Sequence, residues 1–243
     1  LYKASEGDVI KLYNADVVIY NGLHLERKLE EVFEKMLHLN KNTIAVSDAI
    51  DEETLIESES FASNYDPHIW FDIANWELIT KYIISQLSEL DSKNAASYKE
   101  NGEAYLKKLA TLKTAITKMI NPLPIEKRIL VTAHDAFNYF GKAFQFNVVG
   151  LQGLSTATEA GVKDVQKMAT FIIENDVKAI FVESSVPKRT VEALQEAVKS
   201  KAHNIVIGGT LFSDALGDSE TIEGTYIGMY KHNVKTIISS LQK

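Results

Sequence analysis

A long segment with helical periodicity in the middle of the chain limits the folds open to this sequence. Residues 94–120 contain no proline and a single glycine, and apolar side chains recur on one helical face at Tyr98, Tyr105, Leu109, Leu112, Ile116 and Met119. This spacing predicts one amphipathic helix, about 40 Å long at roughly 1.5 Å per residue. Pro122 and Pro124 end it. We expect a rigid connection that crosses two lobes; the alternative is a helix packed on one sheet.

Short apolar runs alternate with helical patterns on both sides of this segment. The runs lie at 16–20, 43–47, 128–132, 147–150, 179–182 and 204–207. Such alternation predicts an α/β fold in which parallel strands are joined by crossover helices. We therefore expect two lobes, each with a parallel sheet: residues 1–91 form the first, 92–121 the long linking helix and 122–243 the second. The last strand is expected to end at Gly208-Gly209.

Composition excludes several classes of function. The formal net charge of −7 argues against nucleic acid as a partner, because phosphates require a basic face. The chain has no cysteine, which excludes disulfides, thiolate zinc sites and cysteine nucleophiles. Any bound metal must therefore be held by nitrogen and oxygen atoms. The sequence also contains no apolar run long enough to span a bilayer.

Four side chains are candidates for a metal site. His68 lies in a turn stiffened by Pro67, while His134, Glu183 and Asp214 follow predicted strands of the second lobe. Open parallel sheets bind ligands at the carboxyl ends of their strands. Imidazole and carboxylate suit Mn²⁺, Zn²⁺ or Fe²⁺, so His68, His134 and Asp214 would lock two lobes around one ion. Glu183 would either orient an imidazole or cap the next helix.

Five segments carry a resemblance to a known family. They read Asn-Gly-Leu-His-Leu-Glu from Asn21, Asp-Pro-His-Ile-Trp from Asp66, Thr-Ala-His-Asp-Ala-Phe from Thr132, Val-Glu-Ser-Ser from Val182 and Leu-Phe-Ser-Asp from Leu211. In this order they resemble signatures of the metal-binding solute receptors of bacterial manganese and zinc ABC importers. The resemblance covers almost the whole chain and implies two lobes joined by one rigid helix.

The resemblance also implies a set of ligands. Family members hold the ion with two histidines of the first lobe, then a histidine or glutamate and an aspartate of the second. Carried over, His68 is the second ligand, His134 the third and Asp214 the fourth. The family's first histidine precedes a segment similar to residues 1–5, so we expect this chain to begin after that ligand, without the opening strands of its first lobe, and to bind metal more weakly than a full-length parent.

The remaining candidates receive structural interpretations. In the family the motif around His24 is structural, and we expect His38, His203 and His232 to be solvated surface residues. Asp135 would either favour the start of the following helix or touch the site.

Three functions follow from these observations. The resemblance implies an extracytoplasmic solute-binding protein, lipid-anchored at the outer face of the membrane or periplasmic, which as a monomer delivers Mn²⁺ or Zn²⁺ to an ABC transporter permease. A zinc-dependent hydrolase with a His/His/Asp site is the alternative. A surface adhesion or scaffold role is supported by no specific feature. The ligands do not distinguish the ions, since Zn²⁺ outcompetes Mn²⁺ at most such sites.

Overall fold

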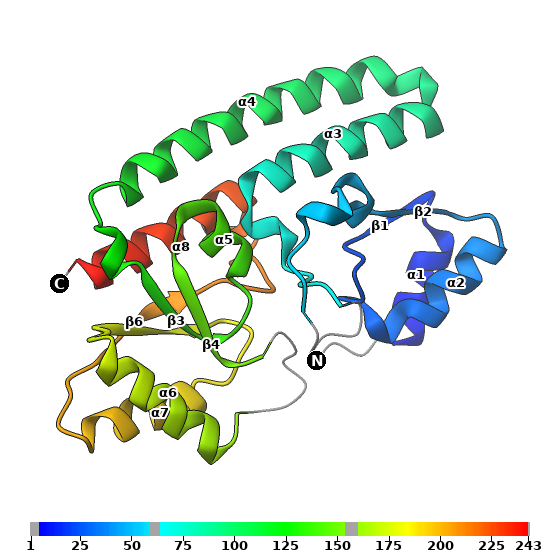
Figure 1. Cartoon of the computed structure of the whole chain (residues 1–243). Coiled ribbons are helices and arrows are strands. Elements are labelled where there is room, and N and C mark those ends of the chain that lie inside the picture. The colour runs from blue at the N-terminus through cyan, green and yellow to red at the C-terminus, as the bar shows by residue number, and fades with distance from the viewer. Residues whose placement is uncertain (1–4, 59–63, 154–159, 243) are drawn as a thin grey trace. The chain divides into compact units, whose positions relative to one another are not determined.

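The computed structural model describes residues 5–58, 64–153 and 160–242 (Figure 1). The chain divides into two compact units, Leu1–Lys108 (unit 1) and Leu109–Lys243 (unit 2). The division falls within the predicted long helix, α4, which is continuous over 26 residues from Ala95 to Ile120. Among the described residues, no helix has the length and apolarity needed to cross a membrane.

Unit 1 contains a two-stranded parallel sheet with helices connected to it. Strand β1 (Val17–Tyr20) pairs with β2 (Asn42–Ala45), and Val17 lies opposite Asn42. Helix α1 (Glu6–Asn14) precedes β1 and begins at a capping box formed by Ser5 and Asp8. Helix α2 (Glu30–His38) connects the strands, and its apolar face packs on β1 through Val18, Phe33 and Met36. The predicted second strand is shorter than expected, because the backbone turns into a 3₁₀ helix after Ala45.

Helix α3 (Ile73–Leu90) follows the turn that carries His68 and packs against α4 within unit 1. Asp72 starts α3 by accepting a hydrogen bond from the Ala74 N–H. A Cβ added at Gly102 would lie 2.0 Å from Ile84 Cδ1, so glycine allows the side chain of α3 to reach the backbone of α4. Trp76 Nε1 also donates to the Tyr105 hydroxyl at 3.1 Å.

Unit 2 contains a four-stranded, fully parallel sheet with the order β4-β3-β5-β6. The strands are β3 (Ile129–His134), β4 (Asn147–Gln152), β5 (Ala179–Glu183) and β6 (Val206–Leu211). They alternate with α5 (Asn138–Phe144), α6 (Val162–Glu174), α7 (Arg189–Lys199) and α8 (Tyr226–Leu241). Helices α6 and α7 cover one face and α8 lies on the other (Figure 1). The predicted parallel sheet with crossover helices is confirmed.

Two strand ends differ from the prediction. Gly208 and Gly209 lie inside β6, which continues to Leu211. A Cβ at Gly208 would be 2.6 Å from Phe181 Cε1 and 2.8 Å from Ser240 Cβ, so these glycines permit close contact between β6 and its neighbours rather than end the strand. His134 is the last residue of β3, whereas we expected it to follow the strand.

Candidate metal centre

In unit 1, a buried carboxylate orients His68. The sequence Asp66-Pro67-His68 turns so that Asp66 Oδ1 accepts hydrogen bonds from the His68 backbone N–H at 2.9 Å and from His68 Nδ1 at 2.7 Å. Both residues are almost fully buried, and the Asp66 N–H is itself bonded to the Ile56 carbonyl at 2.8 Å. An imidazole that donates Nδ1–H to a carboxylate presents its Nε2 lone pair to a metal. Sequence analysis missed this role of Asp66, although its position two residues before His68 was a possible signal.

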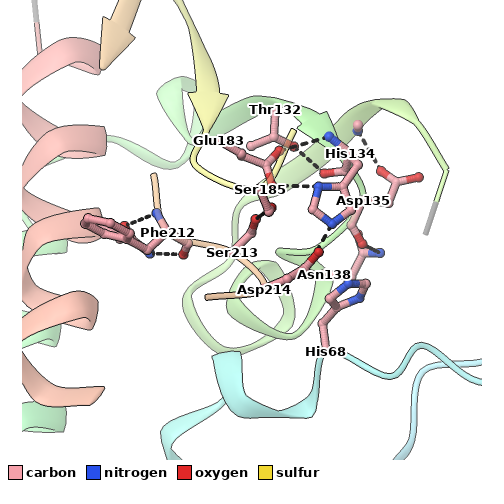
Figure 2. A network of polar contacts seen from close by, with 12 residues as sticks. His68, Thr132, His134, Asp135, Asn138, Glu183, Ser185, Phe212, Ser213 and Asp214 are labelled. Atoms are coloured by element: carbon pink, nitrogen blue, oxygen red, sulfur yellow. Dashed lines mark hydrogen bonds and ion pairs between the residues drawn. The ribbon is translucent and has the colours of Figure 1, made fainter. Parts of the chain in front are cut away.

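In unit 2, the buried carboxylate of Glu183 orients the His134 ring. The two residues end neighbouring strands, β3 and β5, although α5, β4 and α6 separate those strands along the chain. Glu183 Oε1 accepts from the His134 backbone N–H at 2.9 Å, and Oε2 lies 2.6 Å from His134 Nδ1 (Figure 2). Neither side chain is exposed to solvent. Helix α7 has no side-chain cap and begins at Arg189, so the alternative role of Glu183 as a helix cap is wrong.

Asp214 completes the arrangement in unit 2. Its Oδ1 lies 3.5 Å from His134 Nε2, and its side chain is 30% exposed (Figure 2). Two donors bound tetrahedrally to one ion at about 2.1 Å lie about 3.4 Å apart. The spacing of His134 Nε2 and Asp214 Oδ1 therefore suits two ligands of the same ion.

The electrostatic environment of His134 favours positive charge. Burial alone lowers the pKa of an imidazole, but the hydrogen bonds and negative charges of Asp214 and Glu183 outweigh it and raise the pKa of His134 from 6.5 to about 10. Nitrogen ligands must lose their proton to bind a metal. A cation bound at Nε2 would thus replace a proton in a pocket whose two carboxylates already stabilise positive charge.

Asp135, next to His134, has a structural role. Asp135 Oδ1 accepts from the Gly150 N–H at 2.6 Å and holds β4 beside the end of β3. Helix α5 begins at Asn138 after the N-cap Phe137 and has no acidic residue in its first turn, so Asp135 lies outside the turn whose start it was expected to favour.

The other histidines differ in their environments. His24 is exposed and paired with Glu30, and His38 is exposed at the end of α2. His203 is partly buried, near the Val177 carbonyl. His232 is also partly buried, and its Nε2 bonds to the Thr210 carbonyl at 3.0 Å. The expectation of a solvated surface residue is therefore wrong for His203 and His232.

Comparison with known proteins connects this geometry to a family. The family described as "ZnuA: Zinc-uptake complex component A periplasmic" matches residues 1–240. The zinc-binding protein TroA of Treponema pallidum is 45% identical over 243 residues, which cover 100% of this chain and 78% of TroA. The manganese-binding lipoprotein MntA of Bacillus subtilis is 44% identical over 242 residues, with the same coverage of 100% and 78%.

A solved structure agrees with the sequence comparison. The periplasmic zinc-binding protein TroA from Treponema pallidum superimposes with a TM-score of 0.95 at 45% sequence identity, over 99% of this chain and 86% of that one. Fold, signature order and sequence identity thus agree over nearly the whole length. The chain belongs to the family of the periplasmic component A of zinc-uptake complexes.

Proposed function

We propose that this protein captures a divalent transition-metal ion, Zn²⁺ or Mn²⁺, outside the cytoplasmic membrane and delivers it to the permease of an ABC importer. The observation that carries the proposal is the half-site of unit 2, where Glu183 fixes the buried His134 and Asp214 lies 3.5 Å from its Nε2. The relatives named for zinc binding and manganese binding support the same cargo.

The ligand set of the proposal is His68, His134 and Asp214, with Asp66 and Glu183 behind the two imidazoles. Each histidine is buried against a carboxylate that fixes which ring nitrogen faces a ligand. Carboxylates in this position raise the basicity of the imidazole and hold its orientation. Two neutral nitrogens and an anionic oxygen form a donor set that both Zn²⁺ and Mn²⁺ accept.

The chain organisation in this proposal has three parts. Residues 1–91 and 122–243 form two lobes, residues 92–121 form the helix between them, and the bound ion joins the lobes of a monomer. Capture must also be reversible, since a nanomolar site is worth about 12 kcal/mol. The permease has to supply this free energy by separating the ligands of one lobe from those of the other.

A hydrolytic role has no comparable support. Family membership places the chain among uptake components, which bind and transfer a metal rather than catalyse a reaction. Adhesion is supported by no feature of the described residues, and the proposal does not include it.

The test is metal binding by a ligand variant and a matched control. Protein is stripped with a chelator, then titrated with Zn²⁺ and Mn²⁺ in competition with a coloured chelator, and metal content is measured by elemental analysis. We expect one equivalent of metal in the unaltered chain, a loss of at least about 100-fold in affinity for His134→Ala, and no change for His38→Ala, whose side chain is exposed on α2. Unchanged metal content in His134→Ala would remove the proposed site.

A further inference from the structure

Phe212, which precedes the loop that carries Asp214, is held by the side chain of Asn233 on α8. Asn233 lies on α8 and is only 3% exposed. Its Oδ1 accepts from the Phe212 N–H at 2.9 Å, and its Nδ2 donates to the Phe212 carbonyl at 2.7 Å. One amide thus satisfies both backbone groups of Phe212, the residue two positions before Asp214.

The contact between Asn233 and Phe212 lies just beyond the end of the pairing between β5 and β6. The pairing of β6 with β5 ends at Leu211, which lies opposite Glu183, and the Leu211 carbonyl accepts from the Ser184 N–H at 2.9 Å. Phe212 is the next residue, beyond that register. The side-chain amide of Asn233 presents a donor and an acceptor to Phe212, as the backbone of a neighbouring strand would.

Two further contacts hold the loop after Phe212. Ser213 is buried, and its Oγ lies 2.7 Å from Ser185 Oγ, two residues past Glu183 in the chain. The loop then closes on itself, because the Gly217 N–H donates to the Glu223 carbonyl at 2.9 Å. Asp214 therefore lies in a short segment that is tied on one side to α8 and on the other to the end of β5.

We propose that Asn233 is a positioning residue for the metal centre, which holds Asp214 at ion-bridging distance from His134 before an ion binds. This inference rests on the proposed function, because it assumes that Asp214 is a ligand. The physical reason is that Asp214 is 30% exposed and comes from a loop, whereas its partner His134 is fixed in the sheet. Without the Asn233 amide, the loop that carries Asp214 would become ordered only when the ion binds. The conformational entropy lost at that step would weaken the affinity for the ion.

The test replaces Asn233 and reads the coordination sphere directly. Co²⁺ serves as the probe, since its visible absorption reports the geometry of its ligands. Asn233→Leu keeps a similar volume but removes both hydrogen bonds to Phe212. We expect it to bind Co²⁺ about 10- to 100-fold more weakly, with a changed absorption spectrum.

The matched control is Ser240→Ala on the same helix. Ser240 is also buried, and its Oγ donates to the Gly208 carbonyl of the same strand at 2.9 Å. Its removal is expected to lower stability by about 1 kcal/mol and to leave Co²⁺ affinity and spectrum unchanged. A purely structural role for Asn233 would make the two variants alike in metal binding.

A second variant keeps the inference testable if Asn233→Leu fails to fold. Ser185→Ala removes the tether to Ser213 at an exposed side chain, and we expect a weaker loss of about 3- to 10-fold, again with a changed spectrum. If the folded variants bind Co²⁺ with the affinity and spectrum of the unaltered chain, the inference is overturned. If the unaltered chain binds no Co²⁺, Zn²⁺ or Mn²⁺, the proposed function itself fails.

Discussion

At the scale of single residues, the centre is made of histidines whose orientation depends on buried carboxylates. Asp66 holds His68 in unit 1, and Glu183 holds His134 in unit 2. A buried carboxylate is costly unless several hydrogen bonds satisfy it. Asp66 accepts from both the backbone N–H and the ring of His68. Glu183 accepts from the backbone N–H of His134 and forms an ion pair with its ring Nδ1, so each carboxylate is stabilised while it fixes the ring.

We predict that Glu183→Gln weakens metal binding about 10- to 100-fold. Glu183 faces the backbone N–H of His134 with one oxygen and the ring Nδ1 with the other. Glutamine replaces one of these oxygens with an NH₂ donor, so one of the two His134 nitrogens would meet a donor instead of an acceptor. Affinities for Zn²⁺ are measured by chelator competition. Glu192→Gln, at an exposed position of α7, is the control and should bind as the unaltered chain does. Equal affinities for the two variants would contradict the role assigned to Glu183.

Asp66→Asn tests the corresponding pair in unit 1. The expected result is a stability loss of about 1–3 kcal/mol, because the change removes the negative charge beside the buried His68 ring and puts an NH₂ donor at the buried position of the second carboxylate oxygen. We also expect metal affinity to fall by about 10-fold or more. Urea unfolding gives the first quantity and metal titration the second. Asp16→Asn, at an exposed loop position, is the control and should change neither stability nor metal affinity. An unaltered metal affinity in Asp66→Asn would exclude His68 from the ligand set.

At the scale of elements, close packing between neighbouring helices and strands depends on glycines at which an added side chain would overlap the neighbouring element. Gly102 on α4 meets Ile84 of α3, and Gly208 on β6 meets Phe181 and Ser240. Glycine in a helix or strand interior weakens that element, so the cost is offset by the closer packing that it permits. The same glycines mislead sequence analysis, because glycine usually marks a turn.

Gly102→Leu tests the α3–α4 contact. The new side chain would occupy the space of Ile84, and we expect the free energy of unfolding to fall by about 1–3 kcal/mol despite the better helix propensity of leucine. Gly7→Leu in α1 is the control: the nearest atom to its added Cβ lies at 3.7 Å, so it should be neutral or stabilising. Urea unfolding measures both. If the helices pack as described, adding Ile84→Ala to Gly102→Leu restores part of the loss.

At the scale of the whole molecule, the proposed cargo should stabilise the fold. An ion that binds only the native chain adds about 2.7 kcal/mol at a free concentration of 100 times its dissociation constant. Thermal unfolding is recorded with Zn²⁺ and with excess chelator. We expect a higher melting temperature with Zn²⁺ in the unaltered chain and in His38→Ala, and no such shift in His134→Ala. A shift of equal size in His134→Ala would mean that Zn²⁺ binds elsewhere.

The sequence by itself determined the features that depend on local periodicity and on residue chemistry. Helical spacing predicted the long helix, and its structural bounds of Ala95–Ile120 agree closely with the predicted 94–120. Alternation predicted the parallel sheets, and the absence of cysteine limited any metal site to nitrogen and oxygen ligands. The candidates His68, His134 and Asp214 were identified by their motifs, and their shared site stays a proposal.

Only the tertiary structure decided which distant residues support those candidates. Glu183 reaches His134 because β3 and β5 are neighbours in the sheet, an order that local pattern does not encode. Asn233 reaches Phe212 because α8 packs against β6 over a separation of 21 residues. The physical reason is common to both: periodicity reports which face of an element is buried, whereas strand order and helix docking decide what that face meets.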